Sequence, residues 1–329
     1  MALYNRTRKR MGQSDPFLGK KIREYEIVDL IGRGGMGAVY KARHTYLLED
    51  RAIKVIRGNL SDQDKFVERF IREARILTKL KHPNLVQLYE FGTLDEDTFF
   101  MVMELIRGES LLNRMQRLEK IPVAESVKIA AEAARGLYSA HQLGIVHRDI
   151  SPDNIIICKD DAGVESTKII DFGIAKPVLD GKSQRFTDTN MFVGKVEYCS
   201  PEQCGMLEEG EEIDHRSDIY SLAVTMYFML SGKLPFYAAT PHGYLYKHMN
   251  ETPRSLSTRF VSGDFPSQLD RVILKALSKK RDDRQSSMKE FADELEESIG
   301  TYTPVNTDIR RVPVRGVFSP RTFSLRSHS

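Results

Sequence analysis

Apolar and polar residues alternate through about the first hundred positions, whereas apolar residues recur at helical spacing through most of the remainder. Strands are predicted at Tyr25–Val28, Ala38–Ala42, Arg51–Ile56, Leu85–Phe91 and Thr98–Glu104, with a helix at Gln63–Leu80. From Val123 to about Ile299 the pattern is helical, apart from short strands at Ile155–Ile157 and Lys168–Ile170. The pattern therefore predicts an α+β protein with two lobes and an active site in the cleft between them.

The two ends of the chain lack this pattern. Residues 1–20 are polar and basic, and we expect them to form a mobile arm. Residues 300–329 carry five arginines against one acid, Asp308, and their composition is typical of a disordered basic tail. This tail is either a solvated terminus or a segment for interaction or autophosphorylation. The predicted domain is residues 21–299, with an N-lobe at about 21–106 and a C-lobe at about 107–299.

Composition excludes several classes of protein. Apolar residues make up 41% of the 329 residues, but no apolar run reaches the roughly 18 residues that a membrane span needs. No apolar segment of a secretory signal follows the basic N-terminus, so we expect a cytoplasmic location. The net charge of +3 is too small to indicate nucleic-acid binding. The three cysteines are an odd count without the spacing of a zinc site.

A glycine-rich stretch follows the first strand. Residues 32–39 read G-x-G-x-x-G-x-V, and such glycines let backbone N–H groups approach phosphate oxygens closely. A dinucleotide-binding βαβ unit also carries G-x-G-x-x-G, but a helix should follow the glycines there. Here the residues after Gly37 have the pattern of a strand, which favours a hairpin.

The residues from Ile145 to Glu202 carry the chemistry of phosphoryl transfer. Asp149, Asn154 and Asp171 supply one carboxylate to orient and deprotonate a hydroxyl, and an amide oxygen and a second carboxylate to hold Mg²⁺. Their spacing, H-R-D-x-x-x-x-N followed by D-F-G, resembles the catalytic and metal-binding loops of protein kinases. From about Tyr25 to Ile299 the chain is similar to the eukaryotic-type (Hanks-type) Ser/Thr protein kinases of bacteria.

This resemblance implies the two-lobed protein kinase fold, with ATP and Mg²⁺ in the cleft. Asp149 would be the catalytic base, Asn154 and Asp171 the metal ligands, and Lys54, paired with Glu73, the cation on the phosphates. The residues implied around ATP are Ile31, Gly32, Gly34, Gly37, Val39, Ala52, Lys54, Met103, Glu104, Ile106 and Ile156. Any apolar member of this set could instead be core, and for Ile156 the two interpretations are equally supported. Asp218, and Arg284 with Glu202, would be scaffold.

The implied function is transfer of the γ-phosphoryl of Mg-ATP to Ser or Thr hydroxyls of proteins. Ser183, Thr187 and Thr189 are candidate autophosphorylation sites, and Arg148 would receive the phosphate. Self-association for phosphorylation between copies stays open. Two alternatives remain: a kinase-shaped binding module without catalysis, and a small-molecule phosphotransferase. The Ser200-Pro201-Glu202, Asp218 and Arg284 set disfavours the phosphotransferase.

Two positions depart from the pattern of Ser/Thr kinases. Ser151 stands where the family has a lysine, and Lys195 stands where the family has a threonine. One hypothesis is that the missing cation has been relocated, so that Lys195 reaches the space beside the catalytic loop and acts in catalysis. The alternative is that Lys195 points to solvent and Ser151 is tolerated.

Overall fold

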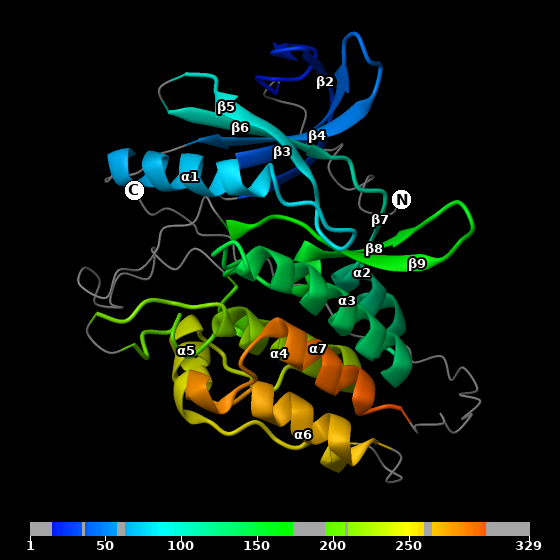
Figure 1. Cartoon of the computed structure of the whole chain (residues 1–329), viewed down its shortest axis with the longest axis vertical. Coiled ribbons are helices and arrows are strands. Elements are labelled where there is room, and N and C mark those ends of the chain that lie inside the picture. The colour runs from blue at the N-terminus through cyan, green and yellow to red at the C-terminus, as the bar shows by residue number, and fades with distance from the viewer. Residues whose placement is uncertain are drawn as a thin grey trace, which may run out of the picture.

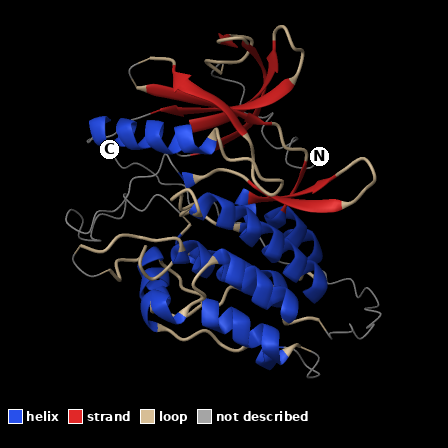
Figure 2. Cartoon of the chain, in the orientation of Figure 1, coloured by secondary structure: helices blue, strands red, loops and turns tan. Residues whose placement is uncertain are grey.

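The structure, a computed structural model, describes residues 15–34, 37–57, 63–95, 97–173, 195–207, 210–259 and 265–300. A strand-rich part that ends near Glu104 lies above a helix-rich part (Figure 1). Colouring by secondary structure shows the same division, with one long helix beside the upper strands (Figure 2). The α+β, two-lobed protein kinase fold expected from the sequence is confirmed.

The described strands of the upper part form an antiparallel six-stranded sheet in the order β1-β2-β3-β4-β6-β5. These strands are β1 Lys21–Ile22, β2 Tyr25–Gly34, β3 Gly37–His44, β4 Asp50–Arg57, β5 Leu88–Thr93 and β6 Thr98–Glu104. Side chains alternate between the faces of a strand, so Ile53 and Val55 point to one face and Lys54 to the other. The sheet therefore has an outer apolar face and an inner face toward the rest of the molecule.

Residues 15–20 pack and hydrogen-bond against this sheet, although the sequence pattern placed them in the mobile arm. Phe17 packs on the outer apolar cluster and lies 5.8 Å from Tyr40, measured between ring centroids. Asp15 accepts a hydrogen bond from the Tyr40 hydroxyl at 3.2 Å and forms an ion pair with Arg33. The outer face needs an apolar cover, and this segment provides part of it. Residues 1–14 and 301–329 lie outside the described residues.

The helix α1, Gln63–Leu77, lies against the inner face of the sheet. Phe70, Ala74 and Leu77 are buried in the large core. The helix ends at Leu77 and not at Leu80 as predicted. The N–H groups of Lys79 and Leu80 donate to carbonyls three residues back, a tightening that is typical of a helix end.

The two lobes are joined by backbone pairing that the sequence analysis did not anticipate. The strand predicted to begin at Leu85 begins at Leu88, because the residues before it pair with the other lobe. Leu85 forms an isolated parallel bridge with Ile169. The Val86 N–H donates to the Ile169 carbonyl at 2.9 Å, and the Ile169 N–H donates to Asn84 at 2.8 Å.

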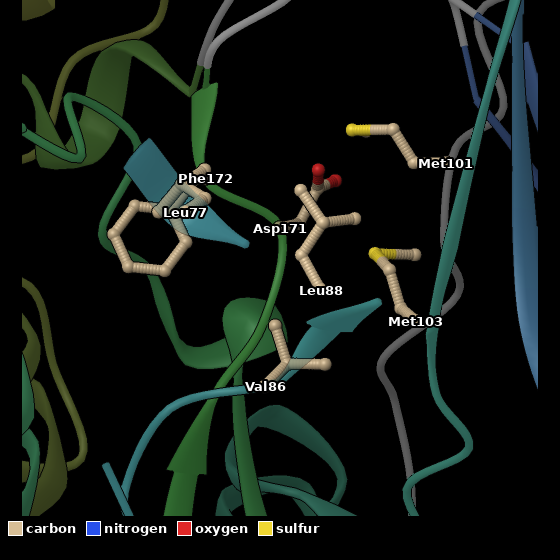
Figure 3. A pocket seen from close by; sticks show the side chains of 7 residues that line it. All are labelled: Leu77, Val86, Leu88, Met101, Met103, Asp171 and Phe172. Carbon is tan, nitrogen blue, oxygen red and sulfur yellow. The ribbon is translucent and has the colours of Figure 1, made fainter. Parts of the chain in front are cut away.

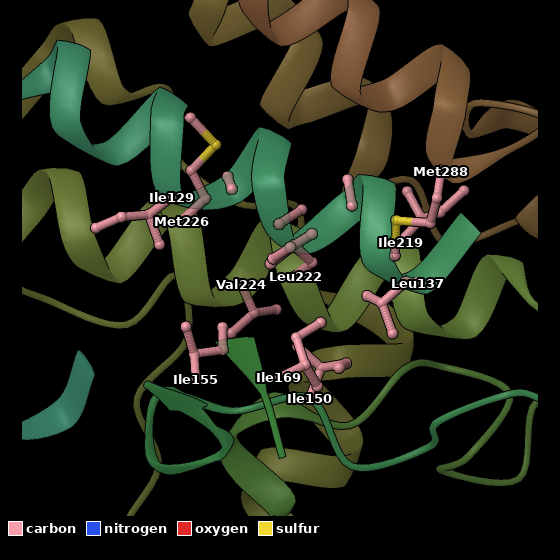
Figure 4. Packing of buried hydrophobic residues seen from close by; sticks show 14 of the residues in the cluster. Ile129, Leu137, Ile150, Ile155, Ile169, Ile219, Leu222, Val224, Met226 and Met288 are labelled. Carbon is pink, nitrogen blue, oxygen red and sulfur yellow. The ribbon is translucent and has the colours of Figure 1, made fainter. Parts of the chain in front are cut away.

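The lower part is a helical core below a small three-stranded sheet. Its elements are β7 Gly108–Ser110, α2 Leu111–Leu118, α3 Val123–His141, β8 Ile155–Lys159, β9 Glu165–Ile169, α4 Arg216–Ser231, α5 Pro241–Asn250, α6 Ser267–Ala276 and α7 Met288–Glu297. Short 3₁₀ helices lie at Pro152–Asn154, Val196–Tyr198, Leu256–Arg259 and Arg281–Asp283. The helix α4 is buried along nearly its whole length, as expected of a helix that is apolar on all sides. Figure 4 shows Leu137 of α3, Leu222 of α4 and Met288 of α7 in this core.

Candidate active site

The loop between α3 and β8 carries His147, Arg148 and Asp149, and a buried carboxylate on α4 holds its backbone. Asp218 accepts hydrogen bonds from the N–H groups of His147 and Arg148, both at 2.8 Å. Burial alone would raise the pKa of Asp218, but the hydrogen bond and charge of His141 and the backbone hydrogen bond of His147 outweigh it and lower the pKa. The carboxylate therefore stays ionised and fixes the loop from beneath.

The side chain of His147 sets the path of the next residues. Its Nδ1 accepts a hydrogen bond from the Asp149 N–H at 3.2 Å, so Nε2 carries the proton and donates to the Ile170 carbonyl at 3.2 Å. Burial lowers the pKa of His147, in agreement with this neutral form. The His147 ring also lies 4.8 Å from the Phe172 ring, between centroids. His147 thus joins the loop of Asp149 to the loop of Asp171.

Asp149 and Asn154 lie next to each other at the two ends of this loop. The Nδ2 group of Asn154 donates to the Asp149 carbonyl at 2.8 Å and to its carboxylate at 3.2 Å. Asn154 ends the 3₁₀ helix Pro152–Asn154, which turns its buried side chain back toward Asp149. The two side chains that the sequence proposed for base and metal ligand are therefore in contact.

Asp171 meets Lys54 across the cleft. Lys54 lies on β4 and Asp171 follows β9, and their side chains form an ion pair between residues 117 positions apart. Asp171 has a φ of 60° and Arg148 a φ of 62°, which non-glycine residues adopt at an energetic cost. Glu73 lies half-buried on α1, and its predicted pairing with Lys54 stays a prediction.

The inner face of the sheet gathers most of the residues expected around the purine. Direct strand partners lie on one face, and the register pairs Val39 with Lys54 and Ala52 with Met103. The strand β6 ends at Glu104, so the backbone groups of residues 105–107, which include Ile106, lie outside the strand ladders. Ile156 is half-buried on β8 of the small sheet. These placements agree with the expected purine pocket, which stays a prediction.

The glycine-rich hairpin forms the end of β2 and the start of β3. Ile31 is 54% exposed, and a Cβ atom added at Gly32 or Gly34 would meet nothing within 4 Å. A Cβ atom at Gly37 would instead overlap the Val55 carbonyl oxygen. Gly32 and Gly34 thus leave the backbone of the hairpin uncovered, whereas Gly37 allows close packing on β4.

A small pocket lies behind these residues, between α1 and β6. Figure 3 shows Leu77, Val86, Leu88, Met101, Met103, Asp171 and Phe172 around it. Six of the seven side chains are apolar, and Asp171 is the charged one. The pocket therefore joins the aspartate proposed for metal binding to the core of the upper lobe.

The residues that follow position 194 contact the catalytic loop. Lys195 donates from Nζ to the Ser151 hydroxyl at 3.0 Å and forms an ion pair with Asp153. Gln203 donates from Nε2 to the Arg148 carbonyl at 2.9 Å. Neither Asp153 nor Gln203 was expected from the sequence, although for Asp153 a signal existed, since this carboxylate lies only two residues from Ser151.

A buried ion pair fixes the far side of this segment. Arg284 contacts both carboxylate oxygens of Glu202, at 2.7 and 2.8 Å, with side chains 0% and 3% exposed. Ser183, Thr187 and Thr189, the expected phosphorylation sites, lie outside the described residues. Among the described helices, none has the length and apolar character that crossing a bilayer would need.

Known proteins share both the sequence and the fold of this chain. Residues 25–296 match the protein kinase domain family. The chain is 34% identical over 290 residues to the serine/threonine-protein kinase pkn3 of Myxococcus xanthus, covering 87% of this chain and 52% of that protein. It is 36% identical over 274 residues to the serine/threonine-protein kinase PknB of Mycolicibacterium smegmatis, covering 82% of this chain and 42% of that protein.

Among solved structures, the kinase domain of Mycobacterium tuberculosis PknI is similar with a TM-score of 0.66 at 27% identity, covering 85% of this chain and 98% of that one. The chain spans about half, or less, of the length of the two curated relatives. The matched residues 25–296 include the catalytic loop, the Asp171 loop and the glycine-rich hairpin. This chain belongs to the protein kinase family.

Proposed function

We propose that this chain transfers the γ-phosphoryl group of ATP to Ser or Thr hydroxyls of proteins. The observation that carries the proposal is two polar contacts, one between Asn154 and Asp149 and one between Lys54 and Asp171, which are 117 positions apart in the sequence. The relatives named as Ser/Thr kinases support the choice of hydroxyl. Positioning and charge stabilisation dominate catalysis of this reaction, so a fixed polar set of this kind is what it needs.

Each of these side chains would have one task. Asp149 would orient the attacking hydroxyl and accept its proton, because it lies on a loop that Asp218 and His147 hold rigidly. Lys54 would place its ammonium on the nucleotide phosphates. Its present pairing with Asp171 shows that the side chain reaches into the cleft from β4. The open backbone at Gly32 and Gly34 would accept phosphate oxygens.

Asn154 and Asp171 are suited to hold Mg²⁺. The Nδ2 group of Asn154 is used by Asp149, which leaves its amide oxygen as a ligand, and the Asp171 side chain is 40% exposed toward the cleft. Mg²⁺ takes oxygen ligands and retains water and phosphate oxygens, so two protein ligands suffice. Bound there, it would neutralise charge on the transferred phosphoryl group.

Phosphorylation within residues 183–189 would raise activity in this proposal. In the described part of the chain, the buried Nε of Arg148 has no hydrogen-bond partner, and a phosphate is a strong acceptor for a guanidinium. Arg148 directly precedes Asp149, so an added phosphate would act next to the base. Phosphorylation between two copies would require self-association, which sedimentation of the purified chain would reveal.

The test is incorporation of labelled phosphate from Mg-ATP into the chain itself and into a generic basic protein. We expect transfer by the wild type and a loss of at least roughly a hundredfold in Asp149→Asn, Lys54→Met and Asp171→Asn. Phosphoamino-acid analysis should find phosphoserine or phosphothreonine. A wild type that binds Mg-ATP but transfers nothing would instead support the binding module.

A further inference from the structure

A lysine from outside the catalytic loop lies against its middle. Lys195 Nζ donates to the Ser151 hydroxyl at 3.0 Å, and Ser151 is fully buried between Asp149 and Asn154. The same ammonium forms an ion pair with Asp153. Two partners for one ammonium, both from residues 151–153, fix its place beside the catalytic loop.

The charge of the loop makes this contact significant. Residues 149–154 contain two carboxylates, Asp149 and Asp153, and no cationic side chain. A phosphoryl group brought to Asp149 is itself negative, so the loop would repel it without a counter-charge. Lys54 forms its ion pair with Asp171, which lies outside this loop. Within the part of the chain that the structure describes, Lys195 is the lysine in contact with residues 149–154.

The ammonium of Lys195 also keeps capacity for a third partner. It has three donors, of which Ser151 and Asp153 take two within the described residues. The side chains of Lys195 and Asp153 are 38% and 41% exposed, so the pair borders open space and is not sealed in the core. A partly solvated ammonium of this kind can bind a phosphate oxygen without a large desolvation cost.

We propose that Lys195 is a catalytic residue whose ammonium stabilises the transferred phosphoryl group, and that Ser151 and Asp153 position it. This inference rests on the proposed function. Lys195 immediately precedes the 3₁₀ helix Val196–Tyr198, so the cation belongs to the segment that follows position 194 and not to the catalytic loop. The active site would then be complete only when that segment lies against the loop.

A purely structural role makes a different prediction. If Lys195 only ties the segment to the loop, its ion pair with Asp153 is the important feature, and Asp153→Asn should be as harmful as Lys195→Thr. If the cation is what matters, Asp153→Asn keeps the ammonium, the Ser151 contact and an acceptor oxygen at position 153, so it should lose clearly less activity than Lys195→Thr. Placing a lysine on the loop itself, by Ser151→Lys, should then restore the activity that Lys195→Thr removes.

The experiment is a double-mutant cycle in kcat, with Lys195→Thr, Ser151→Lys, the double variant and Asp153→Asn. Lys195→Gln keeps most of the side-chain length without the charge and provides a second deletion of the cation. Lys289→Thr on α7 removes a lysine from the exposed pair with Asp293, away from the cleft, and is the matched control. The affinity for Mg-ADP is measured by calorimetry for each variant, which also shows that each is folded.

We expect kcat to fall about a hundredfold in Lys195→Thr and in Lys195→Gln, the scale of one lost transition-state donor. The affinity for Mg-ADP should stay within about twofold, and the double variant should recover most of kcat. Three outcomes in an active wild type would overturn this inference and leave the proposed function standing. These are a near-normal kcat in Lys195→Thr, a double variant no better than Lys195→Thr, and equal losses in Asp153→Asn and Lys195→Thr. A wild type without phosphate transfer would overturn the proposed function as well.

Discussion

At the scale of single residues, the buried pair of Arg284 and Glu202 should make the fold sensitive to the loss of either partner. Arg284 also donates to the carbonyls of Ser278 and Arg216, at 2.9 Å each, so its charge is fully compensated. Arg284→Met would leave the Glu202 carboxylate buried without its cation. Loss of one partner of a buried pair costs about 3–5 kcal/mol of unfolding free energy.

Urea unfolding measures this cost. The control is Lys289→Met, which breaks an exposed pair with Asp293 and should change the midpoint little. If both variants unfold at the same urea concentration as the wild type, the Arg284 pair does not stabilise the fold.

His248 should make the stability depend on pH. It is buried, accepts a hydrogen bond from the Tyr220 hydroxyl at 3.0 Å, and lies 3.2 Å from the Glu197 carbonyl. Burial, and then the charge of Lys279, lowers its pKa from 6.5 to about 3. The unfolded chain therefore binds a proton between these values that the folded chain does not. The contribution of neutral His248 is fully present above about pH 7 and is lost as the pH falls.

By pH 5 the expected loss is roughly 2 kcal/mol of unfolding free energy. His248→Gln keeps hydrogen-bonding groups without this titration, so its stability should fall less between pH 7 and pH 5. The same substitution at the exposed His242 is the control. Equal pH slopes in wild type and His248→Gln would contradict this account.

At the scale of elements, the hairpin of β2 and β3 allows structure and ligand contact to be separated. Gly37→Ala would force a Cβ atom against the Val55 carbonyl of β4, and such overlap typically costs about 1–3 kcal/mol. Gly34→Ala meets nothing in the structure, but its Cβ atom would occupy space through which a phosphate approaches the backbone.

The two variants should therefore differ in what they lose. We expect Gly37→Ala to lower the melting temperature, and Gly34→Ala to leave it unchanged while weakening Mg-ATP binding in calorimetry. A Gly34→Ala variant with normal affinity would place the phosphates elsewhere, and a Gly37→Ala variant with normal stability would contradict the close packing on β4.

The elements also show what a local pattern can and cannot predict. Alternation of apolar and polar residues identified β4, and helical spacing identified α3, because an element with one buried face carries apolar residues at regular short intervals. The local pattern gave the wrong structure where the conformation of a segment depends on residues far away in the sequence. Residues 85–86 look like the start of β5 but pair with Ile169 in the other lobe, and residues 15–20 look like a polar arm but Phe17 packs on the outer face of the sheet.

At the scale of the whole molecule, the candidate site depended on motifs whose geometry no local pattern gives. The spacing of Asp149, Asn154 and Asp171 indicated the chemistry, and the structure brings Asn154 to Asp149. The pairing of Lys54 with Asp171 across the lobes, and of Lys195 with Asp153, depends on how the lobes and the later segment come together. Side-chain reach across a cleft is a property of the tertiary fold, so these two contacts could not be anticipated from the sequence alone.

Because the site is made from both lobes, nucleotide binding should stabilise the whole domain. A ligand present at 100 times its dissociation constant adds about 2.7 kcal/mol to the unfolding free energy when it binds the folded state alone. A non-hydrolysable ATP analogue with Mg²⁺ should therefore raise the melting temperature of the wild type. The same analogue with a chelator should raise it less, because Asn154 and Asp171 would then lack the metal that joins them to the phosphates.

Asp171→Asn separates the metal from the nucleotide. The variant loses the carboxylate that would hold Mg²⁺, and also the partner that now pairs with Lys54. Its melting temperature should respond to the analogue almost equally with Mg²⁺ and with the chelator. Lys54→Met should lower the response in both conditions, since the ammonium would bind the phosphates whether or not metal is present. A wild type that responds identically with and without Mg²⁺ would show that Asp171 does not hold the metal, and the role of this aspartate in the cleft would have to be reassigned.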